Sequence, residues 1–295
     1  MSSAGKISSL IAGTRNWGSW GARFNTSQYI GMIEQCLAWN INTFEHADIY
    51  GHYTTEEEFG NALKEKQSLR DQIRLISKCG INIVSPARPD NKIKYYDTSA
   101  EHIIKSAEQS LVNLNTDHLD VLLLHQPDPL MDPDEIASAF TALKAQGKVR
   151  HFGVANFTPS QVNLLHARIP IQFNQLAISL QELQPFTNGT LDNCLQHGIT
   201  PLAVSPLGGG NILVEQITER EKRIVAVASF LAQKYNVLPE QVMLAWLLVH
   251  PAGIVPVLGT SKTERIELAA KATTITIEKQ DWFLLWRAST GNEVA

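Results

Sequence analysis

Hydrophobic and polar positions follow a repeating pattern along the chain. Short apolar runs alternate with longer stretches in which apolar residues recur every three to four positions. The run 119–125 (LDVLLLH) is apolar almost throughout, which is typical of a strand covered on both faces. Eight runs of this kind occur, at 9–14, 41–45, 73–78, 119–125, 149–156, 171–175, 199–205 and 254–260. The pattern therefore predicts eight strands separated by helices.

Start signals for helices lie between several of these runs. Segments 98–101 (TSAE) and 218–221 (TERE) fit the capping box, in which a Ser or Thr precedes a Glu by three positions. Segments 132–133 (DP) and 158–159 (TP) each place a capping side chain before a proline at the first helical position. These signals predict where four helices begin.

Eight strands alternating with helices over about 250 residues predict an α/β fold, the (β/α)8 TIM barrel. Segment 239–250 predicts an extra helix before the last strand, and segment 278–288 predicts a C-terminal helix. An open doubly wound sheet is the alternative, but no GxGxxG sequence follows the first run. No shift in composition marks a linker, so we expect residues 1–295 to form a single domain.

Charge and composition exclude several classes of function. The chain has 25 basic and 29 acidic residues and a net charge of −4, which does not attract nucleic acid or an anionic membrane. The longest apolar run, 242–249, is far shorter than the roughly 20 residues of a membrane span. The three cysteines are widely spaced and odd in number, which predicts no disulfide framework and a cytoplasmic protein. The nine histidines form no HExxH motif, and we expect no metal site.

Each predicted strand ends in a polar residue. In a (β/α)8 barrel the C-terminal ends of the strands carry the active site. Any one of these residues alone would be read as a loop residue or a hydrogen-bonded core residue, but together they converge on one face of the barrel. They are Thr14, Glu45, Lys78, His125, Asn156, Gln175, Ser205, Thr260 and Ser261.

Four of the predicted neighbours suit acid–base chemistry on a carbonyl group. Lys78 supplies a cation, Glu45 an acid, His125 an imidazole, and Tyr50, five residues after Glu45, a phenol. A free phenol has a pKa of about 10, and a nearby ammonium group lowers it. A carboxylate beside the lysine keeps that lysine charged. This set suits protonation of a carbonyl oxygen while hydride reaches the carbon.

At these residues the chain resembles the aldo-keto reductase family over nearly its whole length. The matching segments are FEHADIYG (44–51), LISKCG (75–80), LLLHQPDP (122–129), GKVRHFGVANF (147–157), FNQLAIS (173–179), SPLGGGNI (205–212) and GTSKTER (259–265). The resemblance implies a (β/α)8 barrel with NADPH (NADP+) as the cofactor. It also implies that Tyr50 donates the proton, Lys78 tunes it and His125 orients the carbonyl.

The acid of the family pattern D-x-A-x-x-Y is replaced here by a glutamate. The segment reads EHADIY, so the aligned acid is Glu45 and the aligned tyrosine is Tyr50. Asp48 and Tyr53 have the same five-residue spacing and offer a second register. The Tyr50-Gly51 pair matches the family's Tyr-Gly, which favours Glu45 and Tyr50.

The resemblance also implies the residues that bind the cofactor. Gly13 and Thr14 match positions near the nicotinamide ribose, and Asn156 and Gln175 match groups that hold the carboxamide. The loop after the seventh strand matches the segment over the pyrophosphate, and the start of the last barrel helix matches the site of the 2′-phosphate. The residues of these two sites are Ser205, Leu207, Gly208, Gly209, Gly210 and Asn211, and Ser261, Lys262 and Arg265. Ser261 and Glu264 also fit a capping box, whose helix N-terminus favours an anion.

Several positions depart from the family. Ala155 replaces a usual serine, and Val204 stands where an aromatic ring commonly stacks on the nicotinamide. Leu268 and Ala269 replace polar residues that face the adenine in many members. Aromatic residues of the predicted loops are candidates for the substrate pocket: Trp17, Trp20, Phe24, Tyr53, Tyr95 and Tyr96.

The sequence therefore predicts an NADPH-dependent oxidoreductase that reduces an aldehyde or ketone, with a small-molecule carbonyl compound as its substrate. The alternative is an NADPH-binding barrel that acts as a redox sensor or partner subunit with slow or vestigial turnover. Glu45 and Val204 motivate this alternative, whereas the intact Tyr50, Lys78 and His125 favour the enzyme.

Overall fold

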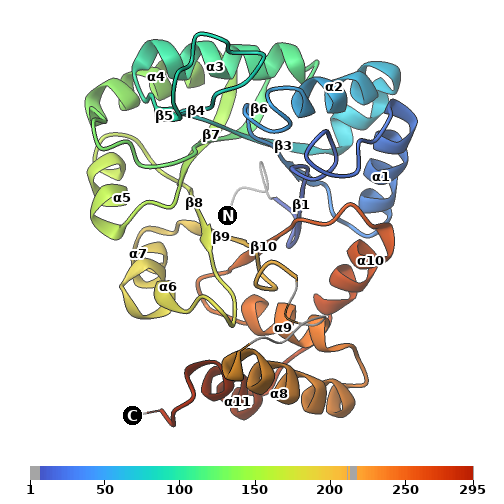
Figure 1. Ribbon diagram of the computed structural model, residues 1–295. Helices are drawn as coiled ribbons and strands as arrows, with labels where there is room; N and C mark the ends of the chain where they lie inside the picture. Colours follow the sequence, from blue (N-terminus) through green and yellow to red (C-terminus); the bar gives the residue numbers. More distant parts are fainter. Residues whose placement is uncertain (1–6, 211, 213–217, 295) are drawn as a thin grey trace.

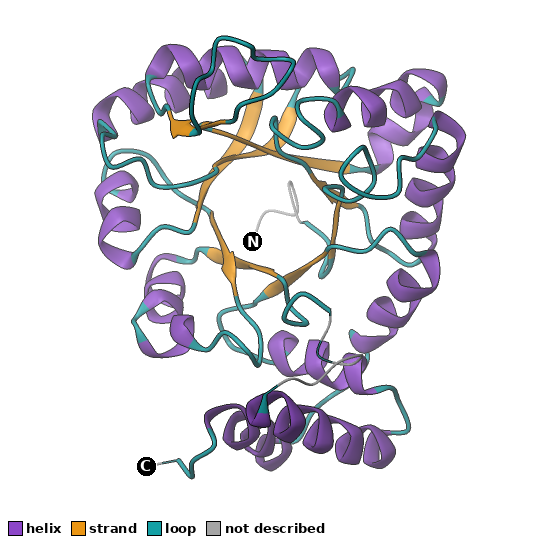
Figure 2. Ribbon diagram, in the orientation of Figure 1, coloured by secondary structure: helices purple, strands orange, loops and turns teal. Residues whose placement is uncertain are grey.

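The computed structural model describes residues 7–210, 212 and 218–294. Eight parallel strands close into a barrel in the order β1-β10-β9-β8-β7-β6-β3-β2, and helices surround it (Figures 1 and 2). Every strand of the barrel overlaps a predicted run, so the predicted (β/α)8 barrel is confirmed. The strands are β1 (Ile11–Gly13), β2 (Thr43–Glu45), β3 (Arg74–Cys79), β6 (Leu119–Leu124), β7 (Val149–Ala155), β8 (Phe173–Ala177), β9 (Thr200–Val204) and β10 (Val255–Leu258).

The helices follow the strands as the alternating pattern predicts. They are α1 (Thr26–Ala38), α2 (Thr55–Glu65), α3 (Ala100–Asn113), α4 (Pro133–Ala145), α5 (Pro159–His166), α6 (Gln184–Thr187), α7 (Thr190–His197), α8 (Glu219–Tyr235), α9 (Pro239–Leu248), α10 (Thr263–Ala272) and α11 (Lys279–Thr290), with a 3-10 helix, η1 (Gln67–Gln72). In the described part of the chain, no helix has the length and apolar character needed to cross a membrane.

Two helices lie outside the ring that surrounds the barrel. Helix α9 packs against β10 and α10, so it is the ring helix of its repeat. Helix α8 packs against the C-terminal helix α11 and against α9, so α8 and α11 form a pair outside the ring (Figure 1). The extra helix before the last strand and the C-terminal helix are thus both present. The extra one is α8 rather than the predicted 239–250, which forms α9.

Three of the predicted helix starts are confirmed. Asp132 accepts hydrogen bonds from the first turn of α4, and Thr158 and Thr218 form capping boxes with Gln161 and Glu221. The prediction for 98–101 is wrong by one position. Ser99 caps α3, while the Thr98 hydroxyl donates to Asp128 in the loop between β6 and α4.

One element had no signal in the sequence. A two-stranded antiparallel sheet, β4 (Ile81–Asn82) with β5 (Tyr95–Tyr96), lies in the connection between β3 and α3. Strands of two residues are too short to show an alternating pattern, so periodicity cannot detect them.

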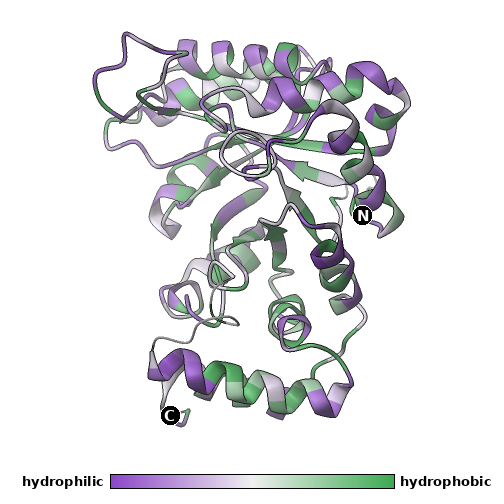
Figure 3. Ribbon diagram, turned by 45° about the vertical axis from the view of Figure 1, so that its right-hand side comes forward, coloured by the Kyte–Doolittle hydropathy of each residue, from purple (hydrophilic) through white to green (hydrophobic). Residues whose placement is uncertain are grey.

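The interior of the barrel is filled by side chains from alternate strand positions. These inward-facing side chains form an apolar cluster, and the strands are mostly hydrophobic in Figure 3. Its residues are Ile11, Ile76, Val121, Leu123, Phe173, Leu202, Val255 and Val257. Since side chains on a strand alternate between two faces, the residue two positions later also points inward. The sequence therefore brings Gly13, Lys78, His125, Gln175 and Val204 to one end of the interior.

Three tryptophan rings join α9 to α11. Trp246 and Trp282 stack with ring centroids 4.9 Å apart, and the indole N–H of each donates to the backbone carbonyl of the other at 3.1 Å. Trp286 stacks on Trp282 at 5.5 Å. Because large aromatic surfaces are buried and both buried indole donors are satisfied, this stack fixes α11 firmly to the ring.

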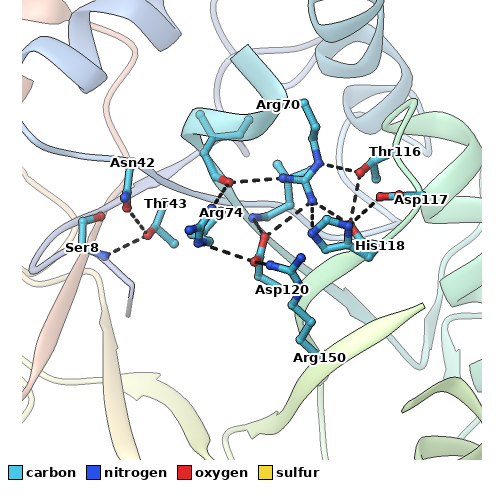
Figure 4. A network of polar contacts seen from close by, with 12 residues as sticks. Ser8, Asn42, Thr43, Arg70, Arg74, Thr116, Asp117, His118, Asp120 and Arg150 are labelled. Atoms are coloured by element: carbon cyan, nitrogen blue, oxygen red, sulfur yellow. Dashed lines mark hydrogen bonds and ion pairs between the residues drawn. The ribbon is translucent and has the colours of Figure 1, made fainter. Parts of the chain in front are cut away.

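A network of charged residues lies where β3, β6 and β7 begin, at the barrel end opposite the strand C-termini (Figure 4). Its centre is the Asp120 carboxylate, which is 2% exposed and accepts a hydrogen bond from the Leu75 backbone N–H at 2.9 Å. Three guanidinium groups surround it: Arg150 at 3.1 Å, and Arg70 and Arg74 at 3.7 Å. One buried carboxylate thus holds three cations from three elements.

We expect Asp120→Asn to destabilise the fold without abolishing the chemistry at the other end of the barrel. The substitution keeps the shape and one acceptor for the Leu75 N–H but leaves three clustered cations without their counter-charge. The three guanidinium groups are 16–49% exposed, so the cost should lie below the about 3–5 kcal/mol for removing one partner of a fully buried ion pair. Urea unfolding measures the change. Asp117→Asn, which removes an exposed carboxylate of the same network, is the control with a much smaller effect. An Asp120→Asn variant as stable as the wild type would contradict this role.

Candidate active site

The candidate site is built around the carboxylate of Glu45. Its Oε1 forms a buried ion pair with the Lys78 ammonium group. The same oxygen accepts hydrogen bonds from the Tyr50 hydroxyl at 3.2 Å and from the Gln175 side-chain amide at 3.1 Å. Lys78 also donates to the backbone carbonyl of His46 at 2.9 Å. Residues that are up to 130 positions apart in the sequence therefore meet at one end of the barrel.

The extra methylene of Glu45 lengthens its reach, and Gly13 on the neighbouring strand leaves space for it. The longer side chain reaches Gln175 on the far side of the barrel as well as Lys78 on the neighbouring strand. Gly13 on β1 leaves room for it, because a Cβ added there would lie 3.3 Å from Glu45 Oε2 and 3.1 Å from the Leu258 carbonyl oxygen. A side chain at position 13 would therefore crowd the Glu45 carboxylate.

A left-handed turn holds Tyr50 beside Glu45. Gly51, His52 and Tyr53 follow it with φ values of 61°, 58° and 72°. Such values are uncommon for His and Tyr and cost of the order of 1 kcal/mol each. The turn directs Tyr53 away from the ion pair, and its hydroxyl accepts the Ile83 backbone N–H at 3.1 Å. The geometry therefore favours Tyr50 over Tyr53 as the tyrosine next to Lys78.

The pKa values of this group differ from the expectation. Burial raises the pKa of the Tyr50 phenol above its ordinary value, with the charge of Arg15 acting against the rise and that of Asp48 adding to it. Burial also lowers the pKa of Lys78 well below its usual range. The net shift of the Tyr50 pKa is therefore opposite to the expected lowering, because desolvation by burial is the largest influence on the phenol.

His125 and Asp48 complete the surroundings of Tyr50. The His125 ring lies 6.2 Å from the Tyr50 ring, nearly perpendicular to it. Burial, aided by the charges of Lys78 and Lys94, holds the pKa of His125 well below its ordinary value, so the ring is neutral. Burial and the charge of Glu56 raise the pKa of Asp48 well above its usual range. Tyr50 is therefore flanked by a neutral imidazole and by a carboxyl group that burial makes harder to ionise.

The residues expected to contact the nicotinamide have different surroundings in the structure. Gln175 donates its amide to Glu45, and Asn156 is exposed with a φ of 63° directly after β7. Thr14 is buried, and its hydroxyl donates to the Glu45 backbone carbonyl at 3.0 Å rather than into the barrel mouth. The alternation of strand positions explains the difference, since Gly13 occupies the inward position.

The two candidate phosphate sites lie after β9 and β10, which are paired neighbours. Ser205 begins the first loop at a φ of 50°, and Leu207 is half-buried. Gly208, Gly209 and Gly210 have φ values of 60°, 83° and 86°, which favour glycine at each position. Asn211 lies outside the described residues.

The second site is the first turn of α10. The predicted capping box of Ser261 and Glu264 is wrong. The N-cap residue is Lys262, and no side chain caps the helix. Lys262 and Arg265 are exposed. The uncapped N–H groups and two cations form an arrangement that fits a phosphate group.

The positions that depart from the family pattern are buried or half-buried. Val204 is half-buried and packs against the apolar interior of the barrel. Ala155 and Ala269 are buried, and Ala269 belongs to the core between the barrel and its helices. In the described part of the chain, no group of three or more His, Cys, Asp or Glu side chains is arranged to hold a metal ion.

Sequence reasoning missed Arg15 at this end of the barrel. Its guanidinium carbon lies 5.2 Å from the Trp20 ring centroid. Trp20 in turn lies 6.0 Å from the Tyr50 ring and 5.4 Å from the His52 ring. Trp17, by contrast, is fully buried. An exposed arginine in a loop carries no distinguishing signal in a single sequence, and only the stacking on Trp20 shows where it points.

Comparison with known proteins identifies the class to which this site belongs. The model of the aldo/keto reductase family matches residues 9–287. The chain belongs to the aldo/keto reductase family and is an oxidoreductase of that type, as the motifs predicted.

Individual relatives extend this result. The chain is 44% identical to Oxidoreductase YdhF of Escherichia coli over 269 residues, which cover 90% of this chain and 89% of that protein. It is 43% identical to a 6-dehydroglucose reductase of Agrobacterium fabrum over 265 residues, covering 89% and 88%. A crystal structure of an aldo/keto reductase from Klebsiella pneumoniae with NADP and acetate has a TM-score of 0.77 and 22% identity, covering 95% of this chain and 91% of that one. This last likeness concerns the fold.

Proposed function

We propose that the protein reduces an aldehyde or ketone to an alcohol with NADPH, and that Tyr50 donates the proton. The observation that carries the proposal is the direct contact of Tyr50 and Lys78 with the Glu45 carboxylate at the C-terminal end of the strands. NADPH, when bound, supplies hydride to the carbonyl carbon. The residues of this chain bind and orient the carbonyl group and protonate its oxygen.

Tyr50 is the proton donor in this scheme. Its raised pKa keeps the phenol protonated at neutral pH, which is the form that reduction needs. In the structure the Tyr50 hydroxyl donates to Glu45 Oε1. To protonate a substrate, it leaves this acceptor and donates to the carbonyl oxygen instead. Lys78 and Glu45 remain below it as an ion pair that can resupply the proton.

His125 orients the carbonyl group. A neutral imidazole carries one N–H, and this donor can hold the carbonyl oxygen close to the Tyr50 hydroxyl. A charged imidazole would compete with Tyr50 as the acid. The low pKa of His125 therefore supports a positioning role rather than proton donation.

The cofactor proposal rests on the two phosphate sites. The uncapped first turn of α10, with Lys262 and Arg265, suits the 2′-phosphate of NADPH. The glycine-rich loop at 208–210 allows a backbone to approach a pyrophosphate closely. Asn156 and Gln175 would hold the carboxamide, and Gln175 can do so by releasing Glu45.

An aldehyde on a sugar is the first substrate class to test. One relative is named a 6-dehydroglucose reductase, and its identity of 43% over most of both chains supports a similar substrate here. Trp20 and His52 beside Tyr50 suit a polyhydroxylated substrate, since an aromatic face packs on C–H groups while polar groups bind hydroxyls. A cytoplasmic setting remains part of the proposal.

An NADPH-consumption screen over sugar aldehydes, simple aldehydes, ketones and quinones tests the function. We expect turnover of at least one aldehyde within the ordinary range of about 1–10³ s⁻¹. Tight NADPH binding with near-zero turnover of every carbonyl compound would instead favour the sensor or partner subunit. Failure to bind NADPH would overturn both.

We also expect a preference for NADPH over NADH. Lys262→Gln with Arg265→Gln should weaken NADPH binding by about tenfold or more, since hydrogen bonds to charged groups are the strong ones. Affinity for NADH should change little. Lys271→Gln, at the other end of the same helix and paired with Glu267, is the matched control. Fluorescence titration with both cofactors measures the effect, and equal losses for NADPH and NADH would show that these residues do not bind the 2′-phosphate.

A further inference from the structure

A fixed cation stands beside the reacting tyrosine. Arg15 follows β1 in a loop, is exposed, and stacks over Trp20 at 5.2 Å. Trp20 is held against both Tyr50 and His52. Stacking on a tryptophan face limits the positions that a guanidinium can sample. Arg15 is therefore part of the wall around Tyr50 rather than a freely moving surface side chain.

The charge of Arg15 is not balanced locally. Its polar contact within the described residues is to the neutral side-chain oxygen of Asn16 at 3.4 Å, and it forms no ion pair with any carboxylate of that part of the chain. The nearby acids are already accounted for. Glu45 is paired with Lys78, and Asp48 is buried without a cationic partner in hydrogen-bond contact. Most of the five N–H donors of Arg15 thus remain available.

The field of this guanidinium reaches the reacting group. The charge of Arg15 acts to lower the pKa of the Tyr50 phenol, against the effect of burial. The geometry agrees, because the Arg15 guanidinium carbon lies 5.2 Å from the Trp20 ring centroid and that ring lies 6.0 Å from the Tyr50 ring. One small molecule can therefore contact both Arg15 and Tyr50.

We propose that Arg15 makes the enzyme selective for carbonyl substrates that carry an anionic group, a carboxylate or a phosphate, held by the guanidinium while the carbonyl lies at Tyr50. This inference rests on the proposed carbonyl reduction and names its substrate class. A guanidinium binds carboxylate and phosphate oxygens through paired N–H donors, which gives both affinity and orientation.

Arg15 also lies near the proposed site for a cofactor phosphate. The loop that carries Arg15 also contacts the segment after β10, because Asn16 donates to the Gly259 carbonyl at 2.9 Å and Trp17 to the Thr260 carbonyl at 3.0 Å. The proposed cofactor phosphate site follows directly at residues 261–265. Arg15 could therefore bind a cofactor phosphate instead of a substrate anion, and the experiment separates the two.

The test compares matched substrates that differ in one charge. kcat/KM is measured at saturating NADPH for D-glucuronate against D-glucose and for succinic semialdehyde against butanal. The variants are Arg15→Gln, Arg15→Lys and, as the control, Arg88→Gln, which removes another exposed guanidinium stacked on a ring, that of Tyr53. The Kd of NADPH is measured for each variant.

We expect the wild type to prefer the anionic member of each pair by about 10- to 100-fold, mostly through KM. Arg15→Gln should lose most of this preference, Arg15→Lys should restore part of it, and Arg88→Gln should keep it. Rising salt should reduce the preference, because exposed charges are screened. No preference in the wild type, or equal losses for both members in Arg15→Gln, would overturn the proposal. A parallel loss of NADPH affinity in Arg15→Gln would assign Arg15 to the cofactor instead.

Failure of the proposed function itself gives a different result. In that case none of the four carbonyl compounds is reduced by any variant. Calorimetric titration of the NADP+-loaded protein with succinate then still reads the anion site, since binding needs no turnover. Binding that is lost in Arg15→Gln and kept in Arg88→Gln would support the site, and no binding to the wild type would reject it.

Discussion

Tyr50→Phe should reduce the rate of carbonyl reduction by about 10²- to 10⁴-fold, the usual contribution of a positioned proton donor. The substitution removes one hydroxyl and its hydrogen bond to Glu45 but keeps the buried ring. Affinity for NADPH should therefore stay nearly the same. Single-turnover kinetics with a reducible aldehyde, together with a cofactor titration, measure the two effects separately.

Tyr53→Phe is the matched control, because the Tyr53 hydroxyl accepts the Ile83 N–H instead of facing Lys78. If Tyr53→Phe proves inactive while Tyr50→Phe turns over, the assignment of the proton donor is wrong. The pH dependence gives a second check. A donor is active in its protonated form, which persists below its pKa, and burial raises the pKa of Tyr50. Reduction should therefore not decline through loss of the Tyr50 proton between about pH 7 and 9.

Glu45→Ala should have the second large effect, on activity and on stability together. Glu45 neutralises the buried Lys78 and receives hydrogen bonds from Tyr50 and Gln175. Loss of one partner of a buried ion pair costs about 3–5 kcal/mol. Burial lowers the pKa of Lys78, and removal of its counter-charge should lower it further, so the pH–rate profile should shift. Chemical unfolding and pH–rate profiles measure the two effects.

Two conservative variants separate the effect of the Glu45 charge from the effect of its side-chain length. Glu45→Gln keeps the length and loses the charge, so it should resemble Glu45→Ala in activity. Glu45→Asp keeps the charge and loses a methylene, so it should hold Lys78, give up Gln175 and retain or exceed the wild-type rate. A large gain in Glu45→Asp from a nearly inactive wild type would indicate a vestigial site. An unchanged rate and pH profile in Glu45→Ala would end the proposed role of Glu45.

The barrel was predictable because its determinants are local. Runs such as 119–124 are apolar on both faces, and Thr158 followed by a proline marks a helix start with one side chain and one fixed torsion. Two of the predicted caps are wrong where a neighbouring residue competes. Ser99 displaces Thr98, and Lys262 displaces Ser261. Moving the start of a helix by one residue along an exposed loop changes the free energy of folding little. Tertiary contacts therefore decide which of two adjacent residues is the N-cap.

The candidate site was predictable as a set of residues but not as a set of contacts. The two-residue period of strands brings Lys78 and Gln175 to one end of the barrel, which the sequence indicates. That Glu45 reaches both of them depends on the room beside Gly13, which is a property of packing. Desolvation of Tyr50 likewise depends on everything around it, so the direction of its pKa shift could not be read from its neighbours in the sequence.

Four of the six tryptophans lie in two separate regions of the molecule. Of the six indoles, Trp246, Trp282 and Trp286 form the stack that joins α9 to α11, while Trp20 stands beside Tyr50. Stacked indoles couple electronically and give strong near-ultraviolet circular dichroism, whereas Trp20 is exposed to quenching by whatever enters the mouth of the barrel. Detachment of α11 and occupancy of the pocket should therefore be separable in the unmodified protein by two spectra, without an introduced label.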